Sequence, residues 1–104
     1  MIFKHNKLVR DKIPEIIRQK GGSPKTVTLD DETYFQCLNQ KLKEEVDEYF
    51  EDYSVEELVD ILEVVYAIAQ HKGLSVDELE SIRLKKHNER GGFDECIFLV
   101  EVEE

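Results

Sequence analysis

Residues 42–69 read LKEEVDEYFEDYSVEELVDILEVVYAIA, and this stretch decides the fold. Its first part continues an apolar stripe with steps of three and four residues, formed by Phe35, Leu38, Leu42, Val46 and Tyr49. That spacing predicts an amphipathic helix from about Asp30 to Glu51. Ser54, with Glu57 three residues later, has the pattern of a capping box and predicts a helix to about Lys72. Two neighbouring helices joined by a tight turn are therefore expected.

Shorter elements flank these two helices. Asp11 can cap a short helix that runs through Lys20, and Ser75 with Glu78 repeats the capping-box pattern for a helix to about Glu89. Residues 96–102 are rich in β-branched and aromatic side chains, which predicts a terminal strand. Residues 27–29 could form a second short strand. We expect an all-α fold: a single domain over residues 1–104, built as a four- to five-helix bundle with one or two short terminal or edge strands.

Composition narrows the possible partners and location. The chain has 24 acidic and 14 basic residues and a formal charge of −10, so it should repel nucleic acid polymers. No stretch approaches the ~20 apolar residues that a membrane span needs. Residues 1–10 lack the apolar region of a signal peptide. We therefore expect a cytoplasmic protein with no membrane partner.

Acidic residues form two pairs that could meet between the helices. Glu45 and Glu48 lie about 60° and 120° from Leu42 on the helical wheel, on the same side, whereas Glu44 points nearly opposite. Glu57 and Asp60 form a second pair with the same spacing of three residues. Four carboxylates facing each other across two helices suit a hard cation, either Mg²⁺ or Mn²⁺.

The apolar residues around Asp60 in the sequence favour a buried position for its carboxylate, although an ion pair or a solvated acidic face stays possible. From Leu58 to Ala69 every residue except Asp60 and Glu63 is apolar or tyrosine, and a helix that is apolar nearly all round is usually buried. A lone buried carboxylate is costly, so Asp60 needs a partner. That partner could be a metal ion, or simply a lysine or arginine from another segment. Glu57 could serve only the Ser54 cap, and acidic helix faces are often merely solvated.

The order of these residues resembles a known signature. Glu44-Glu45-Val46-Asp47-Glu48 followed by Glu57-Leu58-Val59-Asp60 is similar to the E-E-x-x-E … E-x-x-D pattern of the all-α nucleotide pyrophosphohydrolases, the superfamily of MazG and phosphoribosyl-ATP pyrophosphohydrolase. The segments 7–17 (KLVRDKIPEII) and 86–93 (KHNERGGF) resemble the start and the last helix of a MazG-like subgroup that is labelled phosphoribosyl-ATP pyrophosphohydrolase-like.

This resemblance implies a metal-dependent hydrolase that cuts a nucleoside triphosphate, or a related compound, between its α and β phosphates. It implies metal binding by Glu45, Glu48, Glu57 and Asp60. Water made acidic by Mg²⁺ could attack phosphorus, and a carboxylate could orient that water or accept its proton. Glu45 is the first candidate for this role and Glu44 the second.

Basic residues are candidates for binding the phosphates of a nucleotide substrate. Lys86 and Arg90 are four residues apart on the last helix and should share one face, although they could merely complement the helix dipole. Lys41 lies one turn before Glu45 and could reach phosphate or simply pair with that carboxylate. For Arg10 and Lys12, a substrate-binding role is implied by the resemblance alone.

Two kinds of function remain open. The chain could be the enzyme just described, acting on non-standard triphosphates, dUTP, dCTP or phosphoribosyl-ATP. It could instead be a non-catalytic acidic helical bundle that binds a partner protein or senses nucleotides. In either case, a chain this short with one nearly apolar helix should bury that helix against a second copy, so we expect a homodimer or a tetramer.

Overall fold

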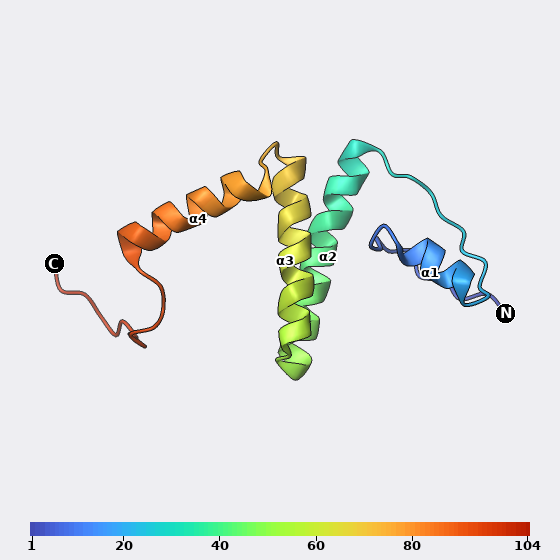
Figure 1. Ribbon diagram of the computed structural model, residues 1–104. Coiled ribbons are helices and arrows are strands. Elements are labelled where there is room, and N and C mark those ends of the chain that lie inside the picture. The colour runs from blue at the N-terminus through green and yellow to red at the C-terminus, as the bar shows by residue number, and fades with distance from the viewer.

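The computed structural model describes residues 1–104 and contains four helices: α1 (Ile13–Gln19), α2 (Asp31–Asp52), α3 (Val55–His71) and α4 (Val76–Arg90). Figure 1 shows α2 and α3 packed side by side, with α1 beyond α2 and α4 projecting away from the far end of α3. The all-α class is confirmed, and the helix bounds lie close to those expected from the sequence. None of the four helices combines the length and the apolar character that a membrane span requires.

A tight turn joins α2 to α3. The backbone of Tyr53 adopts the left-handed conformation with φ of 55°, and its N–H donates to the carbonyl of Tyr49 at 2.7 Å. The side chain of Asp52 accepts a hydrogen bond from the N–H of Ser54 at 3.0 Å. The hydroxyl of Ser54 in turn accepts from the N–H of Glu57 at 3.3 Å, which caps the start of α3. The chain therefore reverses within two residues and α3 runs back along α2.

The core lies entirely between these two helices. Its buried apolar side chains are Leu38 on α2 and Val64 and Ala69 on α3. One charged residue, Glu45, is buried with them and is only 6% exposed. Neither α1 nor α4 contributes a buried side chain to it.

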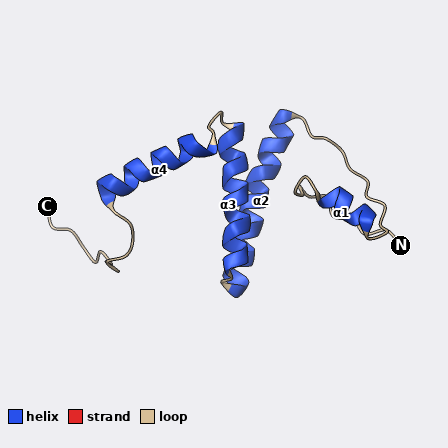
Figure 2. Cartoon of the chain, viewed as in Figure 1, coloured by secondary structure: helices blue, strands red, loops and turns tan.

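The expected strands do not form. Figure 2 shows helices and loops only, and residues 96–102 form no regular structure and have exposed side chains. Residues 27–29 are likewise irregular. A strand is stable only when its backbone N–H and C=O groups pair with a neighbouring strand, and this chain places no partner beside either segment. The prediction of terminal or edge strands was therefore wrong.

The packing also differs from a single-chain bundle. Lengthwise contact occurs between α2 and α3, with a smaller contact between α3 and α4. The side of α3 that carries Leu58, Val59 and Leu62 is exposed, although the apolar run predicted a helix buried nearly all round. Within this chain α3 packs lengthwise only against α2, so it buries only the side that faces α2.

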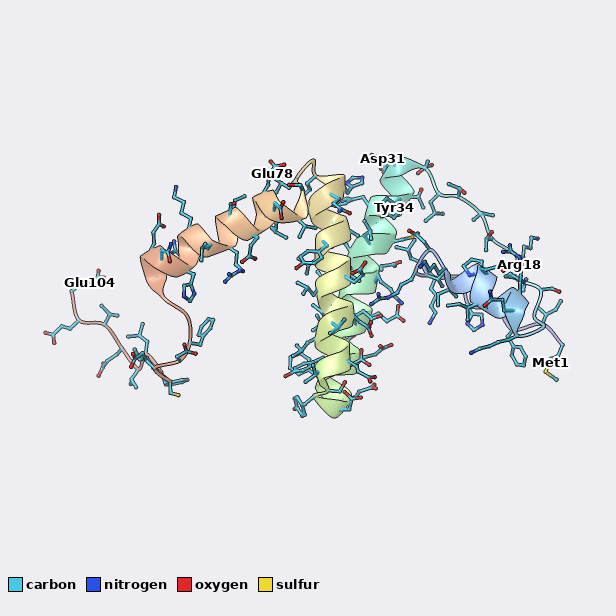
Figure 3. All side chains as sticks on the ribbon, in the orientation of Figure 1. Met1, Arg18, Asp31, Tyr34, Glu78 and Glu104 are labelled. Carbon is cyan, nitrogen blue, oxygen red and sulfur yellow. The ribbon has the colours of Figure 1, made fainter.

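Helix α4 and the following residues extend away from the hairpin. Ser75 and Glu78 form the predicted capping box: the Ser75 hydroxyl accepts from the Glu78 N–H at 3.1 Å, and the Glu78 carboxylate accepts from the Ser75 N–H at 3.3 Å. Gly73, with φ of 90°, provides the left-handed residue that ends α3. Beyond its first turn, α4 projects away from the hairpin in Figure 3, where Met1 and Glu104 lie at opposite ends of the molecule.

Candidate metal centre

The carboxylates of interest continue the line of core residues on each helix. On α2, Glu45 follows Leu38 at a spacing of seven residues and therefore lies on the same side of the helix. On α3, Glu57 and Asp60 precede Val64 at spacings of seven and four residues. The side of each helix that is apolar at one end of the hairpin thus becomes acidic toward the 53–54 turn.

Five acidic residues gather there, and we call them the carboxylate cluster: Glu44, Glu45, Glu48, Glu57 and Asp60. Oxygen atoms of Glu44, Glu45 and Glu48 lie within 4.8 Å of one another. The same limit holds for oxygen atoms of Glu45, Glu57 and Asp60. Glu45 belongs to both groups, so the most buried carboxylate links α2 to α3. These spacings would let one ion contact oxygens from both helices.

Mutual repulsion and burial disturb the acid–base behaviour of two members. Burial raises the pKa of Glu57 to about 7, with the charges of Glu48, Glu45 and Asp60 adding to the effect. Burial and the neighbouring Glu45 also raise the pKa of Glu48 above its usual value. The protein therefore holds these groups where their negative charge is poorly compensated, and a cation placed among them would relieve that cost.

The side chain of Glu57 is free for such a role. Glu57 accepts no hydrogen bond from the Ser54 N–H, so only half of the predicted capping box forms at α3. Its Oε2 atom is buried and has no hydrogen-bond partner. The Ser75–Glu78 pair, by contrast, makes both bonds of the box. Glu57 thus contributes its N–H to the helix cap and directs its carboxylate into the cluster.

Cations from the chain itself already touch the cluster. Lys41 Nζ lies 3.2 Å from Glu45 and 3.5 Å from Glu44. Burial opposes the charge of Lys41, but its contacts with these two carboxylates raise its pKa overall. Arg10 Nη2 lies 2.6 Å from Asp60 Oδ1, which supplies the basic partner considered for that residue. Lys41 pairs with Glu45 as the sequence allowed.

The helical wheel placed Glu44 too far from the site. Its backbone position is outward, but its long side chain reaches the cluster, where Lys7 Nζ lies 3.7 Å from its carboxylate. Lys7 was missed as a candidate by sequence reasoning. The only signal for it was its place at the start of the basic segment 7–12. An open groove of about 520 Å³ lies between residues 6–8 and α2 and is lined by Lys7, Lys41, Glu44 and Glu48 among others.

The remaining predicted cations lie elsewhere in this chain. Lys86 and Arg90 are on the exposed C-terminal half of α4, which projects away from the hairpin. Lys12 occupies the N-cap position of α1 and is exposed. One chain therefore brings the predicted acidic residues together with Lys41 and Arg10, but leaves out Lys12, Lys86 and Arg90.

His71, near the end of α3, packs against the start of α2. Its ring stacks on Phe35 with 4.8 Å between centroids, and its Nε2 is buried without a hydrogen bond. Asp31 Oδ1 lies 3.1 Å from that nitrogen, outside hydrogen-bond geometry. This contact joins the end of α3 to the start of α2, at the end of the hairpin away from the carboxylate cluster.

Comparison with known proteins adds little about function. No family model matches the chain, and no solved structure matches it. An uncharacterized protein from Mycolicibacterium smegmatis is 54% identical over 41 residues, which is 39% of this chain and 42% of that protein. The matched region thus spans less than half the length of this curated relative. The chain is similar to that protein over one segment, and its function must be argued from its own residues.

Proposed function

We propose that this chain is a metal-dependent nucleotide pyrophosphohydrolase that cleaves between the α and β phosphates of a nucleoside triphosphate, or of a related compound, and releases pyrophosphate. The observation that supports it is the carboxylate cluster, in which Glu45 from α2 lies within 4.8 Å of oxygens from Glu57 and Asp60 on α3. This is the acidic arrangement that the resemblance to MazG-like enzymes requires. The cluster combines the buried Glu45 with the partly exposed Glu44 and Glu48, which also line the groove of about 520 Å³.

In this proposal, Glu45, Glu48, Glu57 and Asp60 bind Mg²⁺, with Mn²⁺ as an alternative. All-oxygen donors are typical for both ions. When bound, the ion would supply positive charge to the phosphates and make a nearby water more acidic. It would also solve the electrostatic problem of a protein with charge −10 that must bind a polyanion.

Glu45 is the first candidate to orient the attacking water or accept its proton, because its carboxylate lies close to acidic residues of both α2 and α3. Glu44 is the second candidate, since its side chain reaches the same cluster and is more exposed. Lys41 contacts both residues and would hold them in place until substrate binds. Single substitutions of Glu45, Glu44 and Lys41 can test each of these three roles independently.

The groove beside the cluster offers room for the nucleotide. Its volume of about 520 Å³ falls within the range of small-molecule sites. Lys7 and Lys41 lie on its walls and could contact phosphate oxygens. The groove is open, which suits a substrate whose base contributes less to binding than its phosphates.

The proposal is tested by measuring pyrophosphate release from a panel that includes dUTP, dCTP, non-standard triphosphates and phosphoribosyl-ATP, with Mg²⁺ or with EDTA. Asp60→Asn and Glu48→Gln should abolish turnover while the helix content is unchanged. Glu56→Gln and Glu63→Gln are matched controls, because both residues are exposed acids on α3 outside the cluster. Full activity of the Asp60 and Glu48 variants, or no pyrophosphate from any substrate, would reject the proposal.

The non-catalytic alternative has one observation in its favour. Arg10 and Lys41 already pair with Asp60 and Glu45, so the cluster is partly neutralised without any metal. A docking or sensing module would therefore melt at nearly the same temperature with Mg²⁺ and with EDTA. A metal site filled to 100 times its dissociation constant gains about 2.7 kcal/mol. For a domain of this size that corresponds to roughly 10 °C or more in melting temperature.

A further inference from the structure

Two apolar surfaces of this chain have no neighbour. The first, which we call the α3 stripe, consists of Val55, Leu58, Val59 and Leu62. These residues follow the i, i+3, i+4, i+7 spacing of one helix side, yet they are 47% to 73% exposed. A continuous apolar side of a helix is normally covered, so the α3 stripe requires a partner.

The second apolar surface is the segment after α4. Residues 97–100 read Ile-Phe-Leu-Val and are 72% to 88% exposed. The segment lies apart from α1, α2 and α3 of its own chain (Figure 1). Together with α4 it forms what we call the C-terminal arm, residues 76–102. The arm therefore carries exposed apolar side chains, and the hairpin carries the exposed α3 stripe.

The radius of gyration and the accessible surface of the chain both exceed the values of a compact monomer of this length. Its radius of gyration is 18.4 Å, whereas a compact chain of this length has about 13 Å. Its accessible surface is 9634 Å², whereas a compact monomer of 12.2 kDa exposes about 6,100 Å². Interfaces between permanently associated subunits bury about 2,000–5,000 Å² in total. The excess surface is therefore large enough to supply such an interface.

The distribution of charge indicates which surface the C-terminal arm could bind. Residues 44–63 contain ten carboxylates and no lysine or arginine. The C-terminal half of α4, residues 83–90, contains four lysines or arginines and one glutamate. Lys85, Lys86 and Arg90 have no ion-pair partner within the chain; only Arg83 is paired, with Glu80. The basic half of the arm thus complements the acidic half of the hairpin, and the apolar tail complements the adjacent α3 stripe.

We infer that two copies of this chain exchange their C-terminal arms, so that the arm of each copy packs on the α2–α3 hairpin of the other. Residues 97–100 of one copy cover the α3 stripe of its partner. Lys86 and Arg90 then face the carboxylate cluster of the other copy. A reciprocal exchange closes into a two-fold dimer and leaves neither surface exposed. Only the assignment of Lys86 and Arg90 to substrate binding rests on the proposed function; the exchange itself does not.

The mass of the full chain in solution is the first test. Sedimentation equilibrium should give twice the 12.2 kDa of one copy. Leu62→Glu on the stripe and Phe98→Lys on the tail should each shift the protein to the monomer mass. Val27→Glu is the matched control, because Val27 is 79% exposed but belongs to neither surface, and this variant should remain dimeric. A monomeric wild-type chain, or dimeric Leu62→Glu and Phe98→Lys variants, would overturn the exchange.

Mixing the two variants distinguishes loss of the interface from misfolding of the chain. When Leu62→Glu and Phe98→Lys are combined, a heterodimer keeps one undamaged stripe–tail contact and brings opposite charges together at the other. The mixture should therefore regain the dimer mass. Absence of any dimer in a mixture whose components have normal helical circular dichroism would contradict the inference.

Activity of mixed dimers tests the basic pair. Asp60→Asn and the double variant Lys86→Ala/Arg90→Ala should each be inactive alone. Mixed at equal amounts, they should recover about one quarter of wild-type turnover, since half of randomly formed dimers contain one complete site. No recovery, with mixed dimers shown to form, would place Lys86 and Arg90 outside the partner's site. If the wild-type chain itself releases no pyrophosphate, the proposed function fails, and the mass measurements still decide the exchange.

Discussion

Arg10 Nη2 lies 2.6 Å from Asp60 Oδ1, and this ion pair joins the segment before α1 to the N-terminal half of α3 across fifty positions of sequence. Both side chains are partly exposed, so the pair itself should stabilise the fold by about 1 kcal/mol or less. Its larger consequence concerns the cluster, because a guanidinium on Asp60 competes with a metal ion for the same oxygen.

Arg10→Ala should therefore lower the melting temperature in EDTA by about 5 °C or less, and should increase the rise in melting temperature produced by Mg²⁺. Thermal unfolding with and without Mg²⁺ measures both effects. Arg18→Ala is the control, because Arg18 pairs with Glu15 on α1 and is far from the cluster in sequence. An equal Mg²⁺ response in wild type and Arg10→Ala would show that the ion does not compete with Arg10.

Glu57 should make stability depend on pH in the absence of metal. Its pKa is about 7 in the folded chain against an ordinary value of 4.5. Between these values the folded state binds more protons than the unfolded state, so the free energy of unfolding should fall as pH rises from 4.5 to 7. Glu57→Gln, which mimics the protonated carboxyl, should reduce this slope. Urea titrations in EDTA at several pH values measure it.

Added Mg²⁺ should reverse that trend, because metal ligands bind in their deprotonated form. The stabilisation by Mg²⁺ should therefore grow between pH 5 and 7.5 in the wild-type chain and be much smaller in Glu57→Gln. A wild-type slope in EDTA that is flat over this range would contradict the position of Glu57 in the structure.

Lys41 is the counter-ion of the most buried carboxylate. Lys41→Met keeps the apolar stem but leaves Glu45 without a cation, which should cost roughly 2 kcal/mol of stability in EDTA. Mg²⁺ should restore part of this loss, because the ion takes over the neutralisation of Glu45. Lys43→Met is a suitable control: Lys43 pairs at 2.6 Å with the exposed Asp47, on the outer side of α2. Equal losses in the two variants would mean that burial of Glu45 carries no electrostatic cost.

The Ser54 cap positions the start of α3, where Glu57 lies. Ser54→Ala removes the acceptor for the Glu57 N–H and should lower stability by about 1 kcal/mol. Ser75→Ala removes the comparable acceptor at α4. Because α4 packs weakly on the hairpin, its loss should appear as local fraying rather than as a lower global melting temperature. Hydrogen exchange of the two helices distinguishes these results.

Much of the local structure could be predicted from the sequence. Ser54 and Ser75 gave the starts of α3 and α4, and the stripe that includes Leu38 and Leu42 gave the course of α2. These features depend on neighbours within one or two helical turns, so their physical causes are present in the sequence itself. The same is true of the spacing that places Glu57 and Asp60 on one side of α3.

The strand predicted for residues 96–102 failed for a different reason. Its β-branched and aromatic composition is real, but a strand is completed by the backbone of another segment. The exposure of Glu44 was misjudged in a similar way, since a helical wheel describes the direction of a Cα–Cβ bond and not the reach of a glutamate side chain.

The sequence by itself determined the helices, their limits and the acidic pairs on α2 and α3, because these follow from short-range spacing and capping. Only the tertiary structure decided that Glu45 is buried between the helices, that Arg10 reaches Asp60, and that Lys86 stands away from both. Those relationships join residues that are distant along the chain. These long-range relationships depend on the small number of apolar side chains that the chain buries and on which charged residues form ion pairs between distant segments.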